Sequence, residues 1–561
     1  MGGSAKRSRW TALAALGALA ACDGNGTGPV ALCDRNVSQN VTLAVAAYVA
    51  LAPGANAGCL ILFPGNASST DSAEYLVVPQ IATDAEGATA PFLLDGDTLH
   101  PVLAAQLAGP VPPDGAGVAE QFHDFLRAQE RHHWPALGPA PRVAAAEAMP
   151  GTPFPPPVVG NVRVFSVCRD LSCGSFRRVT ATAKTVSGHL AIYVDTLAPP
   201  GGLTPAELDA LGVLIDSRLY AIDTTAFGRE SDIDANTVVI VLMTNVVNQL
   251  VNAQQCASQG FVAGFFLGAD IDPGYVGDPR VNHGEVFYSI VADPNGTLSC
   301  AHSASLAKRL VPVTFVHEFQ HMISFNQHVL LRRGAPQATW LDEGMSHLAE
   351  ELGGRSFLPD SMAPDYVIGD LFNAYSFLDS PGLHFLAFSS GIGTLAERGA
   401  AWLFVRYITD QFRTDTTFTA TAAFTRSLEQ TNLLGGANVA AATGTPFETL
   451  AERWALASYV ADLPGFGAPP ELRYTSWNFR TTYDSLNKVR PTSFPKPFPL
   501  TPPASSGSAV GLSGTLKAGS GVYALALQGL SAPGFTLFFS GPNDAVLPSA
   551  SVPRLNVIRI R

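Results

Sequence analysis

Charged side chains are scarce in this sequence, and basic ones are the scarcer kind. Charged residues make up 14% of the 561 residues, and 46 acidic residues outnumber 34 basic ones, for a formal net charge of −12. Binding to a nucleic-acid backbone depends on basic side chains, so this balance argues against a nucleic-acid partner. The 47% hydrophobic content excludes a disordered chain, and the length of 561 residues allows about two to four folded domains.

Long apolar runs are also missing beyond the N-terminus. There, a basic start is followed by the apolar run Trp10 to Ala21, which is too short to span a bilayer and is typical of a signal peptide. Leu19 to Cys22 resembles a bacterial lipoprotein cleavage box. We expect cleavage before Cys22, a lipid on that cysteine, and an exported protein anchored to a bacterial membrane or cell surface. An ordinary signal peptide is the alternative.

No two cysteines form a Cys-x-x-Cys pair, which argues against a cysteine metal site. Six cysteines remain besides Cys22, and an even number in an exported protein indicates disulfides. Free buried thiols are the alternative. We expect sequential pairing: Cys33 with Cys59, Cys168 with Cys173, and Cys256 with Cys300.

The most informative motif is His-Glu-Phe-Gln-His at His317 to His321. Residues four apart share one face of a helix, so His317 and His321 can bind one zinc ion while Glu318 acts as general base toward water. The stretch Pro312 to Val329 predicts a helix, because proline suits a first turn and no other proline or glycine interrupts it. Two surface histidines on an amphipathic helix are the alternative.

A second predicted helix offers the third ligand. Thr339 can cap its start, apolar residues recur at helical spacing, and Gly353-Gly354 can end it. Glu343, in the setting Trp-Leu-Asp-Glu-Gly, is the preferred ligand because of its place at the start of this helix. The acids that compete for this role are Asp342, Glu350 and Glu351.

The stretches Thr314 to Asn326 (TFVHEFQHMISFN) and Thr339 to Glu351 (TWLDEGMSHLAEE) resemble the active-site segment of hyicolysin-type bacterial zinc metallopeptidases. A weaker resemblance extends back to about Val162, so it covers about half of the chain. It implies a gluzincin-like site. The Trp-Leu-Asp-Glu-Gly segment also resembles the aminopeptidase N group. The longer gap between His321 and Glu343, and the lack of a Gly-Ala-Met-Glu-Asn-type motif for a free amine, favour an endopeptidase.

The expected reaction is hydrolysis of peptide bonds in a protein or peptide substrate. A zinc ion on the three ligands would lower the pKa of water, and Glu318 would carry its proton to the leaving amine. A second group must stabilise the oxyanion. Its candidates are Tyr407 first, then His347 and Tyr375; a structural role is the alternative for each, and His347 could instead orient a metal ligand.

Several alternatives stay open. A catalytically inactive surface lipoprotein that acts as an adhesin or binding protein is the alternative function. Asp232 to Asn236 resembles the start of a calcium loop but lacks a distal acid, so a polar turn is the simpler interpretation and Ca²⁺ the lesser one. His328 lies on the same helix stripe as the ligands, and we expect it to be exposed.

The fold class expected is α+β: a zincin-like catalytic domain with smaller β-rich domains on either side. A strand at Gly284 to Ile290 is expected at the sheet edge near the active-site helix. Processing in the Pro-rich linker would make residues 23–160 a prodomain. The expected units are a signal peptide (1–21), a β-rich domain (22–100), a Pro/Ala-rich linker with a helix near Gly117 to His132 (101–160), the metallopeptidase domain (161–472) and a β-rich module (473–561).

Overall fold

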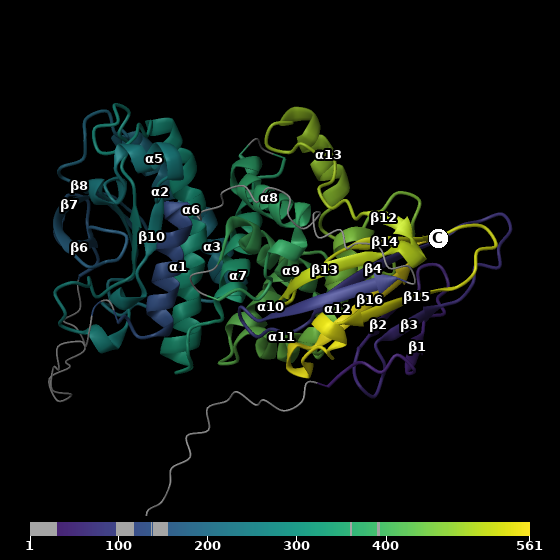
Figure 1. Cartoon of the computed structure of the whole chain (residues 1–561). Coiled ribbons are helices and arrows are strands. Elements are labelled where there is room, and N and C mark those ends of the chain that lie inside the picture. Colours follow the sequence, from purple (N-terminus) through teal and green to yellow (C-terminus); the bar gives the residue numbers. More distant parts are fainter. Residues whose placement is uncertain (1–30, 97–116, 136, 138–154, 360–361, 390–392) are drawn as a thin grey trace, which may run out of the picture.

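The computed structural model describes residues 31–96, 117–135, 137, 155–359, 362–389 and 393–561. The expected signal peptide, Cys22 and most of the Pro/Ala-rich segment lie outside these residues. The described part is α+β, as the sequence predicts, and places a helical layer between one mixed sheet and a pair of sheets (Figure 1). Within it, no helix combines the length and the apolar character needed to cross a bilayer.

A six-stranded mixed sheet forms one side of the molecule, in the order β10-β11-β9-β8-β7-β6. Its strands are β6 (Val162–Cys168), β7 (Phe176–Val186), β8 (Leu190–Asp195), β9 (Val239–Met243), β10 (Gly264–Phe266) and β11 (Val286–Ser289). β8, β9 and β11 run parallel, and every residue of β9 is buried, as expected of a central strand covered on both faces.

The prediction that Gly284 to Ile290 forms the edge strand is wrong in position. β11 does form there, but β10 pairs antiparallel with its outer side and takes the edge. β10 is a three-residue Gly-Phe-Phe segment, too short to give an alternating pattern in the sequence.

Two long helices, α6 (Ala304–Phe325) and α7 (Thr339–Arg355), pack against each other beside this sheet (Figure 1). The helices α8 (Ala363–Asp379) and α9 (Leu395–Phe412) pack on α7. They continue from α7 toward the pair of sheets on the other side of the molecule. The other described helices of four or more residues are α1 (Val118–Arg131), α2 (Pro205–Leu214), α3 (Tyr220–Ala226), α4 (Asn245–Asn248), α5 (Ala253–Gln259), α10 (Phe418–Glu429), α11 (Gly435–Thr443), α12 (Phe447–Val460) and α13 (Phe479–Val489), with π-helical turns at Ile215–Leu219 and Asn326–Leu331.

The ends of α6 and α7 differ from the predicted ones. Ser303 caps α6 by accepting a hydrogen bond from a first-turn N–H at 3.1 Å, so Pro312 lies inside the helix, where it removes one helical hydrogen bond. α7 begins at Thr339 without a side-chain cap and runs through Gly353-Gly354 to Arg355, because both glycines pack closely against α8.

Aromatic packing fixes the rotation of α6. The ring of Phe315 meets Phe287 of β11 edge to face at 5.6 Å and stacks on Phe319 at 5.1 Å. These rings turn one face of α6 toward the sheet and leave His317 and His321 to face α7.

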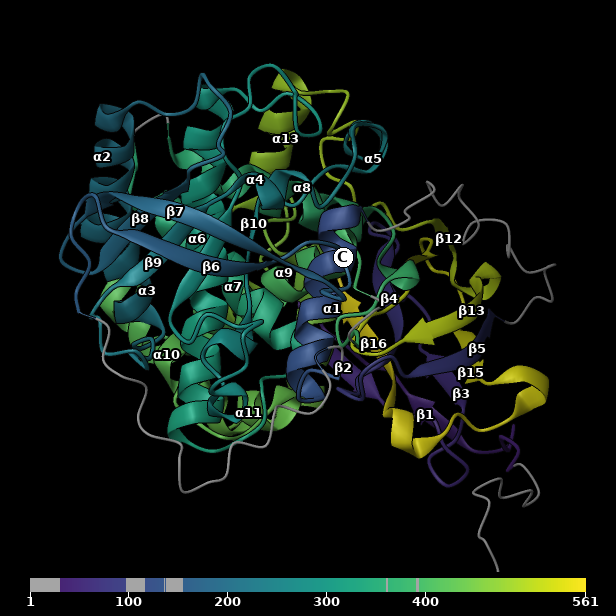
Figure 2. The ribbon, with the colours of Figure 1, turned by 90° about the vertical axis from the view of Figure 1, so that its left-hand side faces the viewer.

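Strands from both ends of the chain form a β-sandwich (Figures 1 and 2). Its sheets have the orders β1-β3-β15-β5-β13 and β12-β14-β4-β16-β2. The strands are β1 (Ser38–Asn40), β2 (Tyr48–Leu51), β3 (Leu60–Phe63), β4 (Ala73–Ile81), β5 (Thr89–Gly96), β12 (Ala504–Ser506), β13 (Gly511–Lys517), β14 (Ala524–Gln528), β15 (Phe535–Ser540) and β16 (Pro553–Arg559).

The sandwich joins two segments that the sequence analysis treats separately. Val77 of β4 lies opposite Val557 of β16, and both side chains belong to the core between the sheets, with Phe92 and Leu537. Strands between residues 38 and 96 and strands between residues 504 and 559 therefore form a common unit. Pairing between strands so distant in sequence leaves no local signal, because each strand shows only its own alternation.

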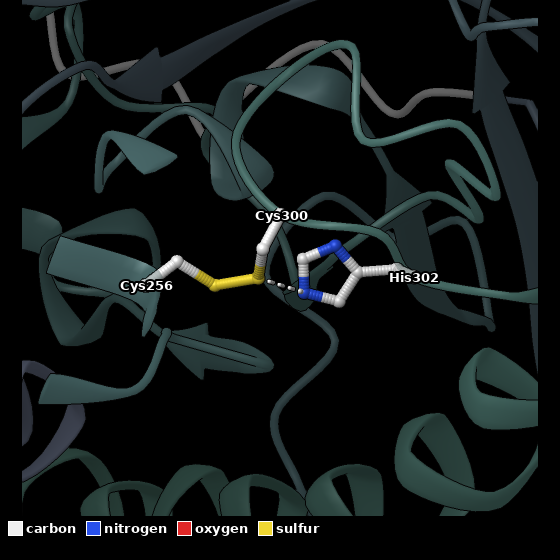
Figure 3. Close-up of side chains that lie close together, drawn as sticks. All are labelled: Cys256, Cys300 and His302. Atoms are coloured by element: carbon white, nitrogen blue, oxygen red, sulfur yellow. Dashed lines mark hydrogen bonds between the residues drawn. A yellow bond between two sulfur atoms is a disulfide. The ribbon is translucent and has the colours of Figure 1, made fainter. Parts of the chain in front are cut away.

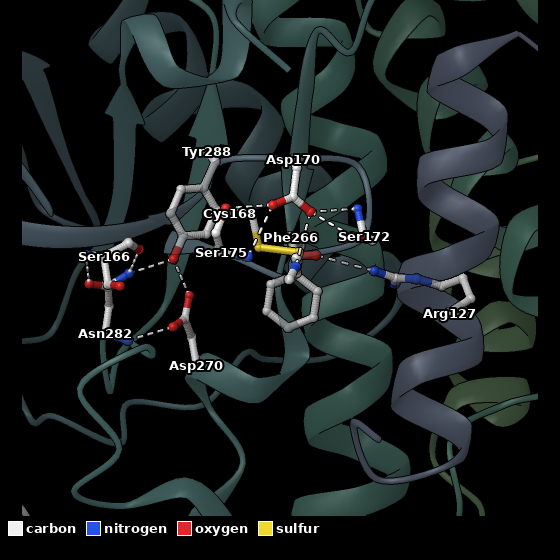
Figure 4. Close-up of a disulfide and its surroundings, with 12 residues drawn as sticks. Arg127, Ser166, Cys168, Asp170, Ser172, Ser175, Phe266, Asp270, Asn282 and Tyr288 are labelled. Atoms are coloured by element: carbon white, nitrogen blue, oxygen red, sulfur yellow. Dashed lines mark hydrogen bonds between the residues drawn. A yellow bond between two sulfur atoms is a disulfide. The ribbon is translucent and has the colours of Figure 1, made fainter. Parts of the chain in front are cut away.

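The structure forms three disulfides. The Cys168–Cys173 bridge closes a loop in which Asp170 accepts hydrogen bonds from Ser172 and Ser175 (Figure 4). Beside the bridge to Cys300, His302 Nε2 lies 3.8 Å from the Cys300 sulfur (Figure 3); because that sulfur is bonded, it is not a thiolate ligand. The pairs are those expected from the sequence: Cys33–Cys59, Cys168–Cys173 and Cys256–Cys300.

Candidate metal centre

Three side chains from two neighbouring helices converge inside the molecule. His317 and His321 project from α6, and Glu343 projects from the beginning of α7. His317 Nε2 lies 3.6 Å from Glu343 Oε2, and His321 Nε2 lies 3.7 Å from Glu343 Oε1. All three residues are buried. The structure thus brings together the three residues that the sequence analysis selects as metal ligands.

A carboxylate holds the outer nitrogen of each imidazole. His317 Nδ1 donates to Glu350 Oε1 at 2.7 Å, and His321 Nδ1 donates to Asp342 Oδ2 at 2.9 Å. With a proton on each Nδ1, each Nε2 is free to bind a metal. Asp342 and Glu350, the competing ligand candidates, thus occupy the position from which carboxylates orient histidine ligands.

The inner atoms of this cluster are all electron-pair donors, so they need a positive charge between them. The two Nε2 atoms face each other 3.2 Å apart, and both oxygens of Glu343 are buried without a hydrogen-bond partner among the described residues. Burial lowers the pKa of His317, but Glu343 and Glu350 outweigh it and raise that pKa well above its ordinary value. Burial lowers the pKa of His321, which favours the neutral form that ligates metals. The donor set therefore fits a metal ion.

Glu318 lies beside the cluster and is held from two sides. Its Oε2 accepts a hydrogen bond from the Phe266 N–H of β10 at 3.0 Å, and its Oε1 lies 3.1 Å from His123 Nδ1 of α1. Burial alone would raise the pKa of this carboxyl, but His123 and the two cluster imidazoles outweigh it and hold the pKa well below its usual range. Glu318 is thus ionised, as a general base must be.

Helix α1 reaches this site, which the sequence analysis did not predict. Arg398 of α9 links α1 to the cluster: its guanidinium lies 3.3 Å from Asp124 Oδ1 and 3.6 Å from Glu343 Oε2. His123, Arg127 and Glu130 lie on one buried face of α1. The sequence predicts a helix here. The polar stripe is the one further sequence signal for a role at the site, but the same stripe would also be expected on a helix face exposed to solvent.

Tyr407, the first candidate for the oxyanion, does not lie in this cluster. It stands nine residues after Arg398 on α9, a rise of about 13 Å along the helix axis. Its hydroxyl donates to the Glu471 carbonyl at 2.7 Å. The Tyr375 hydroxyl accepts from the Lys496 N–H at 2.7 Å. Both hydroxyls therefore bond to the C-terminal part of the chain, which fits a structural role, and an oxyanion role for either tyrosine stays a prediction.

His347 does lie next to the cluster. Its ring centroid is 4.9 Å from that of His317, and its Nδ1 donates to Asp370 Oδ1 at 2.8 Å. Its Nε2 is buried without a hydrogen-bond partner in the described part of the chain. A catalytic role for it stays a prediction. The expected exposure of His328 is wrong, because this side chain is fully buried, with Nε2 3.5 Å from Glu429 Oε2.

A second group of acids gathers at the loop that resembles a calcium site. Glu285, next to β11, joins Asp232 and Asp234, with one oxygen of each acid within 4.8 Å of the others. Protein donors already meet most of these oxygens: Ser231 Oγ donates to Glu285 at 2.5 Å, and Arg163 lies 3.5 Å from Asp234. Such satisfaction is what a polar turn requires, so calcium stays an untested prediction.

Comparison with known proteins gives one informative likeness. No family model matches the sequence. Over 151 residues the chain is 24% identical to the neutral metalloprotease ShpI of Staphylococcus hyicus. The match covers 27% of this chain and 32% of that protein, so it spans about a third of the relative's length. The likeness supports a relationship to metalloproteases, the class to which a buried His-His-Glu metal centre also points.

Proposed function

We propose that this chain is a zinc-dependent endopeptidase with a zincin-like catalytic domain. The observation that carries the proposal is the buried convergence of His317 Nε2, His321 Nε2 and the Glu343 carboxylate, with Glu318 beside them. Two imidazoles and one carboxylate, with a fourth position left for water or substrate, are the donor set of catalytic zinc sites. The substrate class is protein or peptide.

The chemistry follows from the placement of Glu318. Bound Zn²⁺ would supply Lewis-acid activation of water and of the substrate carbonyl. Glu318 takes a proton from the attacking water and delivers it to the nitrogen of the departing amine. The Phe266 N–H fixes the carboxylate of this base, while Glu350 and Asp342 prevent rotation of the imidazoles.

We place the enzyme outside the cytoplasm, anchored to a bacterial membrane or cell surface by a lipid on Cys22. Three disulfides support this location, because disulfides persist mainly in oxidising compartments. The alternative of an inactive adhesin or binding protein is disfavoured, because the base and the ligand set are complete.

The test combines metal content with turnover. Purified protein should contain zinc, and hydrolysis of dye-labelled casein should stop with chelator and return with added Zn²⁺. Glu318→Gln should retain zinc but lose about 10²- to 10⁴-fold in kcat, since only the proton acceptor is removed. Asp415→Asn, which removes an exposed charge, should change neither quantity. Equal turnover by wild type and Glu318→Gln would refute the assignment of Glu318.

A further inference from the structure

Helix α1 packs between the edge strand β10 and helix α9, beside the helices that carry the metal site. In Figure 1 it runs beside β10, with α7 and α9 on its other side. The Phe122 ring packs edge to face on Phe265 of β10 at 5.1 Å, and Asp124 pairs with Arg398 of α9. Phe122 is fully buried in these contacts. Any substrate that reaches Glu318 along β10 therefore meets α1 first.

Side chains of α1 bind two outward backbone groups at and just beyond the C-terminal end of β10, while Glu318 of α6 accepts from the Phe266 N–H. Arg127 Nη2 donates to the Phe266 carbonyl at 3.3 Å (Figure 4), and the Gly268 N–H donates to Glu130 Oε1 at 3.3 Å. Phe266 and Gly268 are two residues apart, so in an extended segment their outward groups point to the same side. An unpaired sheet edge of this kind pairs readily with an extended peptide.

Arg127 and Glu130 together take the places of the N–H and C=O groups that such a strand would present to this edge. Arg127 supplies a donor where a substrate N–H would lie, and Glu130 supplies an acceptor where a substrate C=O would lie. The two side chains are buried and lie 3.2 Å from each other, so each also contacts the other in this position. One turn away on the same helix, His123 lies 3.1 Å from Glu318 Oε1. α1 thus engages both the substrate-pairing edge and the general base.

On the basis of the function proposed above, we propose that α1 is an internal inhibitor that lies in the substrate cleft. The substrate it excludes is an extended polypeptide that pairs with the Phe266 carbonyl and the Gly268 N–H. Substrate binding and α1 docking are then mutually exclusive. Departure of α1 frees His123 from Glu318 and opens the edge of β10 in the same event.

Hydrogen exchange of the full-length, zinc-loaded wild-type protein tests this without any substitution. The probe is a fluorescent peptide hydroxamate, whose hydroxamate binds zinc and whose peptide is long enough to pair with β10. When the probe binds, the amides of Val118–Arg131 should exchange at least about tenfold faster, because docked α1 is displaced. Amides of β10 should exchange more slowly. Probe binding that leaves exchange in α1 unchanged, or slows it, would overturn the proposal.

A paired substitution gives a second, independent readout. Arg127→Met together with Glu130→Gln keeps side-chain volume and leaves no unpaired buried charge. The association rate of the probe and the kcat/KM for casein should both rise about tenfold, which corresponds to about 1.4 kcal/mol lost from α1 docking. Asp415→Asn, at an exposed position before α10, should change neither. Thermal unfolding verifies that all variants fold. A folded double variant with unchanged or slower probe binding and lower turnover would assign α1 to the catalytic apparatus and overturn the proposal.

The two proposals fail in different ways. If wild type and double variant bind zinc and cleave casein equally, only the inhibitory role of α1 is refuted. If neither protein binds zinc or the hydroxamate, the peptidase function is refuted and the inhibitory role falls with it.

Discussion

Two clusters of ionisable side chains lie within the same half of the molecule, and they are built in opposite ways. In the first, His317, His321 and Glu343 turn their inner atoms toward one point, and the Glu343 oxygens have no hydrogen-bond partner among the described residues. In the second, Asp234 and Glu285 accept hydrogen bonds from backbone and side-chain donors around them.

This difference indicates which kind of acidic cluster is stabilised by a bound metal ion. Burial of a charge without hydrogen-bond donors costs several kcal/mol, so a cation stabilises the first cluster, where the Arg398 guanidinium lies 3.6 Å from Glu343 but makes no hydrogen bond to it. In the second cluster most oxygens meet N–H groups, O–H groups or Arg163, and of Glu285 only Oε2 lacks a hydrogen-bond partner among the described residues, so a cation adds less there. The number of hydrogen-bond donors around the carboxylate oxygens, rather than the number of acids, distinguishes the two clusters.

Removal of a ligand should give the largest effect. His317→Ala should lower zinc affinity by more than about 10³-fold, because the remaining donors no longer surround the ion. Asp234→Asn is the matched control in the second cluster and should leave zinc affinity unchanged. Competition with a chromophoric chelator measures both constants. If His317→Ala and wild type bind zinc equally, the proposed difference in metal binding between the two clusters is refuted.

The second cluster should make the free energy of unfolding depend on pH. Burial raises the pKa of Glu285 to about 7, from an ordinary value of 4.5, against the opposing bonds from Ser231 and Ile233. The folded protein therefore keeps a proton on Glu285 that the unfolded chain releases, and the contribution of Glu285 to the free energy of unfolding should fall by roughly 3 kcal/mol as pH rises from about 4.5 to about 7.

Glu285→Gln should remove this contribution and flatten the pH dependence, as measured by urea unfolding at several pH values. Asp415→Asn, an exposed control, should keep the wild-type slope. An unchanged slope in Glu285→Gln would show that Glu285 is ionised in the folded protein, and a rise in unfolding midpoint with added Ca²⁺ would make the second cluster a metal site after all.

Loss of an orienting carboxylate should have an intermediate effect. Glu350→Ala leaves the His317 imidazole free to rotate and should weaken zinc binding by about 10- to 100-fold. Asp342→Ala should act similarly through His321. Chelator competition at equal pH measures both. Should either variant lose zinc as completely as His317→Ala, that carboxylate would be a ligand rather than a support.

Tyr407→Phe should give the smallest effect, because this residue lies outside both clusters. It removes one buried hydrogen bond to the Glu471 carbonyl and should cost about 1 kcal/mol of stability. The kcat for casein should stay within twofold of wild type, about 0.4 kcal/mol at most. A hundredfold loss of kcat would restore Tyr407 as the oxyanion stabiliser.

The sequence predicts the metal centre well because its determinants are local. His317, Glu318 and His321 lie within five residues, and helical geometry alone sets their common direction. Glu343 follows on the next helix, and the disulfides also follow from simple order along the chain. Most of the long helices and central strands can likewise be predicted, since each shows its own periodicity over enough residues.

What the sequence does not predict depends on contacts between distant segments. β10 is too short to signal its place at the edge, and nothing in the polar stripe of α1 says that it faces Glu318. The burial of His328 depends on Glu429 of α10, about a hundred residues later. Only its residue type suggests Tyr407 for the site. Residue type does not indicate how far along the axis of α9 this side chain lies from the metal centre.

The sandwich has a consequence for how the chain matures. β4 pairs only with β14 and β16, and β5 only with β13 and β15. Both N-terminal strands therefore wait for partners that are synthesised last, after the entire metal-binding half. Until strands β13 to β16 (Gly511 to Arg559) have been made, β4 and β5 lack these partners, and the chain presents open edges to chaperones or to other copies of itself. A ribosome that stalls before the last sixty residues or so would leave the metal centre encoded in full but the sandwich unable to close.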